Sequence, residues 1–387
     1  MAMTSRERVL SSINHEEPDR VPIIIGVSNA TSMKMNLYRS LKRKLGVYAQ
    51  DRYLYDWLEL GTADIDEQTL QRLKSDVRGV TDRIPETVSQ RNQARPPHTP
   101  SYDDWGIGHE EIEPGVWYPN IHPLSQANTI QEIDTYSWPD MDDPSRLNNV
   151  RDRVRQLHAE NQYAIMGTPW LLFPLERAFG LQGMDQFLTN MALEPEFAQE
   201  LLKKITDLCK SLMGNFLRET GEYLDIIKIG DDLGMQDRLM ISPQMYRKFL
   251  KPVHSEYISF IKNKTDAKLF FHTDGDIYDL LDDFVEIGVD ILNPIQTHAG
   301  RLGNLADLKK RYGKRLSFCG AIDTQQVLPF GNPQQVREEV RRVIKEMAPG
   351  GGYLLAAVHT ITDQVPVENV IAMIDAVEEY GYYPIAE

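Results

Sequence analysis

From Tyr163 onward, short apolar runs alternate with longer segments of helical periodicity, and this alternation constrains the fold more than any other feature of the chain. Each run lacks alternating polar residues and ends in glycine or polar residues, which is typical of strands buried on both faces of a parallel sheet. In chain order, the expected strands are Ala164–Gly167, Leu224–Ile229, Lys268–Phe271, Asp290–Ile295, Leu316–Cys319 and Tyr353–Val358. Strands that alternate with helices in this way predict a parallel α/β sheet.

The N-terminal part of the chain adds a helix and further strands to this pattern. Thr4–Leu10 reads as a capped helix, and Val21–Gly26 and Ser75–Val80 read as strands. About eight βα units predict one closed (β/α)8 TIM barrel over residues 1–387. The alternative is an open, doubly wound sheet, but neither a GxGxxG nor a GxxxxGK[ST] motif follows any expected strand. The barrel is therefore favoured.

Residues 84–125 depart from the alternation of strands and helices. A proline-rich stretch, Arg95–Pro100, precedes short aromatic segments at Asp104–Gly106 and Gly115–Tyr118. Short strands separated by turn residues predict a β-hairpin inserted into the barrel. The aromatic residues within 101–120 are compatible with a lid over the site and equally with a contact between subunits of a homo-oligomer.

The charge balance restricts the partners of the protein. There are 42 basic and 57 acidic residues, a net charge of −15, which disfavours nucleic acids and anionic membrane surfaces. No window approaches the roughly 18 consecutive apolar residues of a membrane span, and the first residues lack the apolar core of a signal peptide. Two cysteines do not make a disulfide framework. We therefore expect a cytoplasmic protein.

In a barrel, the residues that follow the strands converge at one end, where catalytic sites lie. The candidates from these positions are Asp231, Asp232, His272, Asp274, Cys319 and His359. Catalytic zinc sites use three protein ligands and leave one position open. His272, Asp274 and His359 provide such a set, with Cys319 as a substitute or neighbour.

Other readings of the same residues are equally open. His272 and Asp274 can form a hydrogen-bonded pair that donates a proton without a metal, or they can simply cap a turn. Asp231 can orient a substrate or neutralise a cation, or it can cap the next turn.

Several motifs spread over the whole chain resemble the uroporphyrinogen decarboxylase superfamily. They are Arg6–Leu10 with Pro18–Pro22, Gly167–Trp170, Ile241–Pro243, Phe271–Gly275, Cys319–Thr324 and Pro349–Ala356. The resemblance implies a (β/α)8 barrel, in agreement with the alternation of strands and helices. The superfamily contains two functional classes, and this chain departs from both of them at informative positions.

True decarboxylases of the superfamily carry an arginine-rich segment after the first strand and a tyrosine beyond the Gly-x-Pro motif. Here Gly26–Met35 contains no arginine, and Leu175 stands at the place of the tyrosine. A porphyrinogen with many carboxylates needs fixed cations, because its charges lose water on binding. The resemblance thus argues against decarboxylation, although His359 matches the late histidine of the decarboxylases.

The second class comprises corrinoid-dependent methyltransferases, whose zinc enzymes have His-x-Cys after the fifth strand and a cysteine near the eighth. This chain has His272-Thr273-Asp274 and His359 at those places. The exchange of sulfur ligands for oxygen and nitrogen suits an oxygen-bearing substrate better than a thiol.

The chain is most similar to the methyltransferase components of O-demethylases, of the veratrol and vanillate type. This implies transfer of a methyl group from an aromatic methyl ether to the Co(I) corrinoid of a partner corrinoid protein, with release of a phenol. The implied catalytic residues are His272, Asp274 and His359, acting with or without zinc, and Asp231 and Cys319 assist or orient. Two alternatives are uroporphyrinogen decarboxylation and a non-catalytic barrel that binds a tetrapyrrole.

Overall fold

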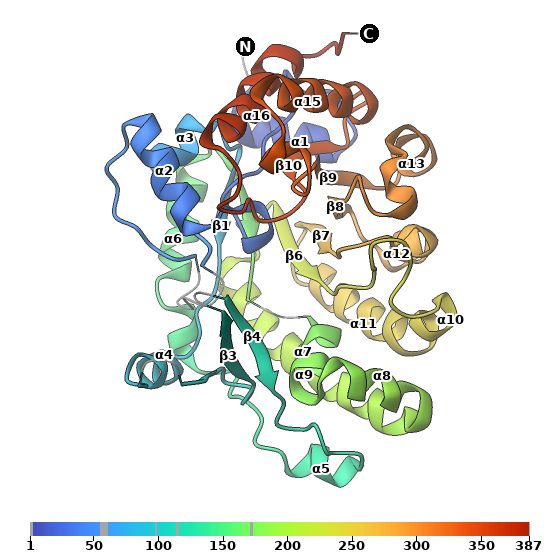
Figure 1. Ribbon diagram of the computed structural model, residues 1–387. Helices are drawn as coiled ribbons and strands as arrows, with labels where there is room; N and C mark the ends of the chain where they lie inside the picture. Colours follow the sequence, from blue (N-terminus) through green and yellow to red (C-terminus); the bar gives the residue numbers. More distant parts are fainter. Residues whose placement is uncertain (1–2, 55–60, 97–98, 114–115, 171–172, 387) are drawn as a thin grey trace.

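The chain forms a curled parallel sheet surrounded by helices (Figure 1). The computed structural model describes residues 3–54, 61–96, 99–113, 116–170 and 173–386. Seven strands lie in the order β1-β5-β6-β7-β8-β9-β10, and neighbouring strands are parallel. Their bounds are β1 Val77–Val80, β5 Ala164–Gly167, β6 Ile226–Gly230, β7 Lys268–His272, β8 Ile291–Ile295, β9 Ser317–Ile322 and β10 Tyr353–Ala357.

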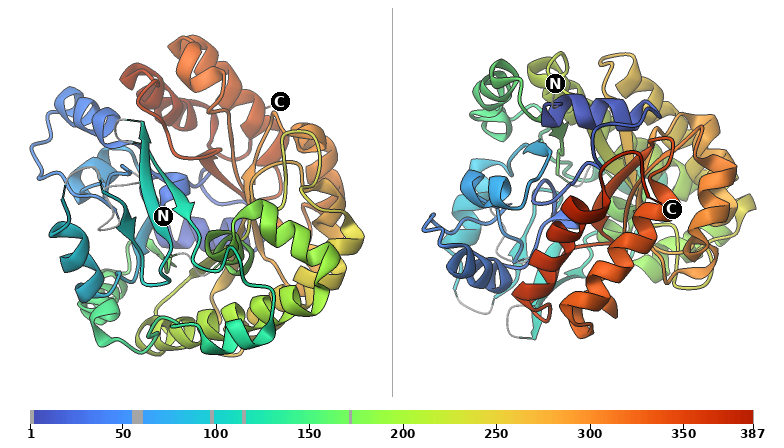
Figure 2. Two further views of the ribbon diagram at one scale, coloured as in Figure 1. Left: turned by 60° about the horizontal axis from the view of Figure 1, so that its bottom comes forward. Right: turned by 90° about the horizontal axis from the view of Figure 1, so that it is seen from above.

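The helices lie around the sheet (Figures 1 and 2). In the first half of the chain they are α1 Ser5–Ile13, α2 Met35–Leu45, α3 Glu67–Arg72, α4 Glu86–Gln93, α5 Ile130–Thr135, α6 Val150–Glu160, α7 Pro174–Gln182, α8 Met184–Leu193 and α9 Pro195–Thr220. In the second half they are α10 Pro243–Met245, α11 Lys251–Lys262, α12 Leu281–Ile287, α13 Leu305–Tyr312, α14 Val327–Phe330, α15 Pro333–Met347 and α16 Val367–Tyr380. Among the described residues, no helix combines the length and apolar character needed to cross a bilayer.

The segment of residues 21–25 closes the barrel between β10 and β1. The backbone N–H of Ile24 donates to the carbonyl of Leu355 at 2.9 Å, and that of Asp76 donates to the carbonyl of Ile23 at 2.8 Å. The expected strand Val21–Gly26 is nevertheless only an isolated bridge at Ile23. The reason is that side chains replace part of the ladder, since Asp76 Oδ2 accepts from Ile23 N and Ser75 Oγ accepts from Ile25 N. The predicted barrel architecture is confirmed.

The interior of the barrel is filled by alternate residues of the strands, because successive strand residues point to opposite faces. These interior residues form one apolar cluster, which includes Val77, Met166, Ile226, Phe270, Ile291, Cys319 and Leu354. Val9 and Ile13 of α1 belong to the same cluster, so α1 packs against one end of the interior. Thr4 and Glu7 form a capping box that fixes the start of this helix.

The expected hairpin is present as an antiparallel sheet of β2 Ser101–Tyr102, β3 Gly108–Glu113 and β4 Val116–Ile121 (Figure 2, left). Its tip, residues 114–115, lies outside the described residues. The insertion is attached to α7, because Arg177 donates to Asp103 at 2.8 Å. Trp105 packs edge-on against Trp138 beside this ion pair. The insertion thus connects to the helix that follows β5.

Candidate functional site

Three neighbouring strands send polar side chains into the barrel. Ile226, Phe270 and Ile291 belong to the interior cluster, so Lys228, His272 and Asn293, two residues further along the same strands, also face inward. All three side chains are buried. The apolar interior of the barrel therefore gives way to a polar layer at the carboxyl ends of the strands, which is where barrel enzymes carry their sites.

Asp274 and His359 complete a cluster with His272 at this end of the barrel. Asp274 Oδ2 lies 3.9 Å from His272 Nε2 and 3.7 Å from His359 Nε2. The two imidazole rings have their centres 5.6 Å apart. The His272 side chain is 7% exposed, whereas Asp274 and His359 are 32% and 38% exposed. The cluster thus has a buried floor and an open, solvent-facing side.

Asn293 fixes the orientation and the tautomer of His272. Asn293 Nδ2 donates to the carbonyl oxygen of Cys319 at 3.4 Å, so its Oδ1 is the atom that faces His272. His272 Nδ1 lies 2.7 Å from this Oδ1 and must carry the proton that it donates. The lone pair of His272 Nε2 is therefore directed toward Asp274 and His359.

Both histidines are held in the neutral form. Burial, with a contribution from the positive charge of Lys228, lowers the pKa of His272 to about 3. The pKa of His359 is also lowered, because protein atoms surround much of its ring although 38% of the side chain stays exposed, and solvent at the exposed part limits this shift. Burial also raises the pKa of Asp274, which the neighbouring Asp232 reinforces. Neutral imidazoles are the form in which histidine binds metals.

The three residues suit a metal ion. Their ligand atoms all lie within 4.8 Å of one another. In a tetrahedral zinc site ligand atoms lie about 3.3 Å apart, given zinc–ligand distances of about 2.0–2.1 Å. The two carboxylate–imidazole separations of 3.7 and 3.9 Å are close to this value, and the widest pair, within 4.8 Å, would have to close by up to about 1.5 Å to bind one ion. Two imidazole nitrogens and one carboxylate oxygen are a donor set that zinc accepts, and Asn293 supplies the second-shell hydrogen bond typical of such ligands.

Lys228 and Glu176 were not among the residues predicted from the sequence, whereas Asp232, which lies with them, was a candidate. Burial lowers the pKa of Lys228 to about 8, against the opposing effect of Glu176, Asp232 and Asp274. Burial likewise raises the pKa of Glu176 and of Asp232, whose Oδ1 accepts from the backbone N–H of Asp274 at 2.9 Å. The available signal was a lysine at an inward-facing position of the otherwise apolar strand Ile226–Gly230.

Asp231 lies apart from the cluster. It follows Gly230 and faces outward between the barrel and its helices, where the backbone N–H groups of Leu175 and Glu176 donate to it at 2.9 and 3.0 Å. His254 Nε2 lies 2.8 Å from its other oxygen. Asp231 was expected to orient a substrate, to neutralise a cation or to cap the turn that follows it; in the structure its carboxylate instead accepts from the first turn of α7, an earlier helix.

Cys319 lies in the apolar interior of the barrel and touches the site only through Asn293. Burial raises the pKa of its thiol. The thiol is therefore protonated at neutral pH, and the cluster of possible metal ligands contains the two histidines and Asp274 without Cys319.

Asp82 is a further buried acid that was not predicted. It follows β1, and its Oδ1 accepts from the backbone N–H of Trp170 at 2.6 Å. Burial raises its pKa to about 7. In the sequence Asp82 stands among the polar residues Thr81–Arg83 after a short strand, a pattern too common to be informative.

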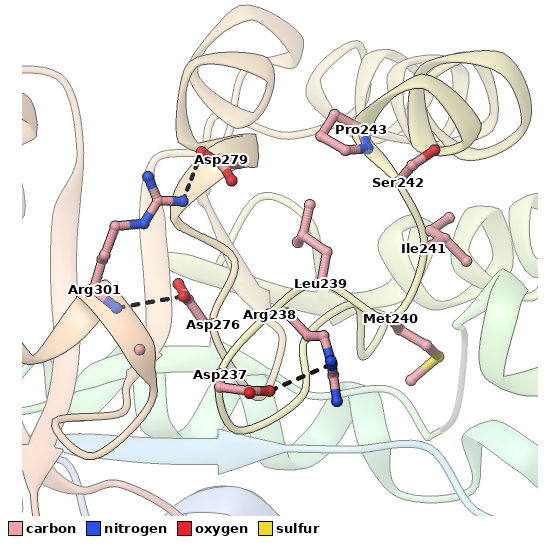
Figure 3. A pocket seen from close by; sticks show the side chains of 11 residues that line it. Asp237, Arg238, Leu239, Met240, Ile241, Ser242, Pro243, Asp276, Asp279 and Arg301 are labelled. Atoms are coloured by element: carbon pink, nitrogen blue, oxygen red, sulfur yellow. Dashed lines mark hydrogen bonds and ion pairs between the residues drawn. The ribbon is translucent and has the colours of Figure 1, made fainter.

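A groove of about 570 Å³ lies on the same rim, between the loops that follow β6, β7 and β8 (Figure 3). Asp276, Asp279 and Arg301 lie on one side, opposite Leu239, and Asp237 and Arg238 lie below (Figure 3). Arg301 is paired with Asp279 at 2.6 Å and Arg238 with Asp237 at 3.4 Å. The groove is therefore a mixed polar and apolar surface next to the turn that carries Asp274.

Comparisons with known proteins agree with this architecture. The family profile described as Uroporphyrinogen decarboxylase (URO-D) matches residues 111–380. Uroporphyrinogen decarboxylase of Alkalilimnicola ehrlichii is 23% identical over 98% of this chain and 95% of that protein, and the Legionella pneumophila enzyme is 26% identical over 67% and 70%. A methyltransferase from Methanosarcina mazei has a similar structure, with a TM-score of 0.64 at 17% identity over 98% and 99% of the two chains. This chain belongs to the uroporphyrinogen decarboxylase family.

Proposed function

We propose that this protein is a methyltransferase that moves the methyl group of an aromatic methyl ether to the Co(I) corrinoid of a partner protein and releases a phenol. The observation that carries the proposal is the open cluster of His272, Asp274 and His359, with both imidazoles neutral. A methyltransferase of the same fold, from Methanosarcina mazei, supports the choice of this branch.

The residues after the first barrel segment argue against a substrate with many carboxylates. Gly26–Met35 contains no arginine, and Asn29–Thr31 forms a 3-10 turn there. The Thr31 hydroxyl accepts from Ser28 N at 3.0 Å, so this turn is stabilised internally by its own polar groups. A substrate with several charges needs guanidinium groups that form paired hydrogen bonds with carboxylates. A neutral ether makes no such demand.

The reaction develops negative charge on the ether oxygen as the bond from carbon to oxygen breaks. His272, Asp274 and His359 would hold zinc, and a bound zinc ion would supply a Lewis acid for this oxygen. Asn293 keeps the His272 lone pair directed into the cluster. The exposed side of Asp274 and His359 leaves room for substrate and for a corrinoid brought by its partner.

The proposal is tested by mixing the purified protein with zinc, Co(I) cobalamin or a Co(I) corrinoid protein, and a panel of methoxyarenes. We expect the Co(I) absorption to decay and methyl–cobalt absorption to appear together with an equimolar phenol. The His298→Ala variant is a matched control, because His298 is a rim histidine paired with Asp323 at 3.3 Å outside the cluster. Absence of methyl–cobalt with every donor would refute the proposal.

Decarboxylation is the second candidate, because the curated relatives named above are uroporphyrinogen decarboxylases. It predicts release of CO2 from uroporphyrinogen without any cobalt. Binding of a tetrapyrrole with neither reaction would instead favour a non-catalytic barrel.

A further inference from the structure

Lys228 is a buried, positively charged residue at the floor of the site. It has no role in the reaction proposed above. Lys228 is 5% exposed, and its ammonium lies 5.0 Å from the centre of the Phe173 ring. Burial of a lysine costs free energy unless its charge is compensated. A methionine at this place would extend the apolar interior without that cost, so stability alone does not explain the lysine.

Lys228 stands on β6, beside the strand that carries His272, and charged groups on both sides of it affect its pKa. On one side its charge acts on both His272 and His359. On the other side it interacts with Glu176, from the first turn of α7, and with Asp232, which follows β6. Lys228 and His272 face the barrel interior from neighbouring strands, so the ammonium lies on the same side of the sheet as the cluster.

We propose that Lys228 is a catalytic residue that binds the oxygen atom on which negative charge develops, and that it selects substrates whose leaving group is an aryl oxide. This inference rests on the proposed function and adds the group that recognises the departing oxygen. A preorganised cation in a buried site stabilises such charge more strongly than water does. The Phe173 ring next to the ammonium provides an aromatic surface for the aryl group of the substrate.

The step balances without any further reagent. The electron pair of Co(I) forms the new bond to the methyl carbon, the bond from carbon to oxygen breaks, and its electron pair stays on the oxygen. Cobalt is formally oxidised from Co(I) to Co(III) as the methyl group is transferred. The resulting phenolate is held by a hydrogen bond from the Lys228 ammonium, and it leaves with or without a proton from water.

Binding of the product analogue 4-nitrophenolate, measured without corrinoid, tests this role separately from turnover. We expect Lys228→Met to weaken binding by about 10- to 100-fold, the usual contribution of a hydrogen bond to a charged group. Lys228→Arg keeps a cation at this position and should bind 4-nitrophenolate more tightly than Lys228→Met does. Lys309→Met is the matched control, because Lys309 is a partly buried lysine that donates to Gly351 O outside the site.

Unchanged affinity in Lys228→Met would overturn the inference, and so would affinity in Lys228→Arg as low as in Lys228→Met, or absence of phenolate binding by the wild type. If Lys228→Met does not fold, Lys228→Gln carries the test, because it keeps a polar side chain at this position and removes the charge. Unchanged affinity in Lys228→Gln would likewise overturn the inference.

A second experiment uses ethers whose phenols differ in acidity. In Lys228→Met the demethylation rate should fall most for ethers of weakly acidic phenols. The phenolate of such a phenol holds its negative charge poorly and needs the cation, whereas nitrophenolate needs little stabilisation. An equal loss for all ethers would contradict the role of Lys228 while leaving methyl transfer intact. Failure of the wild type to demethylate any ether would instead count against the proposed function.

Discussion

The Nε2 atom of His359, just beyond β10, lies 3.7 Å from Oδ2 of Asp274, just beyond β7, although these strands are not neighbours in the sheet. The same carboxylate oxygen lies 3.9 Å from His272 Nε2. One oxygen therefore faces two imidazole nitrogens from different parts of the chain. Asn293 holds the His272 imidazole from behind through a hydrogen bond at 2.7 Å, as the supporting groups of metal-binding histidines do.

Replacement of any one cluster residue by alanine should remove most of the demethylation activity. For His272→Ala, Asp274→Ala and His359→Ala we expect a loss of at least about 100-fold, comparable to removal of one preorganised group from a transition-state site. Zinc content should fall in parallel in each variant. Activity with cobalamin and metal analysis measure both, and His298→Ala should retain both. Full activity in a variant that contains no zinc would instead favour proton donation by the His272–Asp274 pair without a metal.

Replacement of Asn293 should act on the metal through His272. In Asn293→Ala the Nδ1–H of His272 loses its acceptor at 2.7 Å, and the ring is free to change tautomer. We expect zinc affinity to fall by about 10- to 100-fold, as for other second-shell changes. Competition with a zinc chelator measures this. An unchanged affinity would show that Asn293 does not position the ligand.

Asp231 should affect stability rather than metal binding. Its carboxylate and His254 are both fully buried and 2.8 Å apart, and it also caps α7. In Asp231→Ala a buried imidazole loses its partner, so we expect the free energy of unfolding to fall by about 3–5 kcal/mol. Urea denaturation tests this, with Asp237→Ala, whose side chain is 71% exposed, as the control. A loss of zinc without a loss of stability would show that Asp231 acts in metal binding.

Asp82 should make stability depend on pH. In the unfolded chain its pKa is near the ordinary 3.8, and in the folded protein burial raises it to about 7. The folded protein therefore binds more protons between these values, and its stability falls as the pH rises from about 4 to about 7. Asp82→Asn stays uncharged, so its advantage over the wild type should grow by about 2–3 kcal/mol between pH 5 and pH 8. Denaturation curves at both values test this, and a constant difference would contradict it.

The barrel was predictable because each strand and its following helix have a strong local signal. The five apolar residues of α15, from Val336 to Met347, are all buried as their helical spacing predicts. The prediction of a full strand over Val21–Gly26 was wrong. Its apolar run does not reveal that the side chains of Ser75 and Asp76 accept hydrogen bonds that backbone carbonyls would accept in a regular strand. Such replacement depends on residues far along the chain.

The proximity of His272, Asp274 and His359 was predictable from the ends of their strands, whereas the roles of the neighbouring residues were not. His272 and His359 follow different strands, and a closed barrel must bring such positions to one rim. Asp231 and Asp232 are indistinguishable in the sequence, yet the first faces the helices and the second faces the site. Cys319 precedes Gly320 within β9, so the thiol lies one level inside the barrel. These differences follow from where β6 and β9 end, which is the least certain part of a sequence-based assignment.

The most direct measurement of the central claim follows the fate of an isotopically labelled methyl group. The protein is incubated with zinc, a Co(I) corrinoid and an aryl ether carrying a labelled methyl carbon, and the products are separated. The account predicts that the label moves to cobalt and that unlabelled phenol appears in equal amount, with neither product formed by His359→Ala. Label that stays in the ether, while the same preparation releases CO2 from uroporphyrinogen, would contradict it.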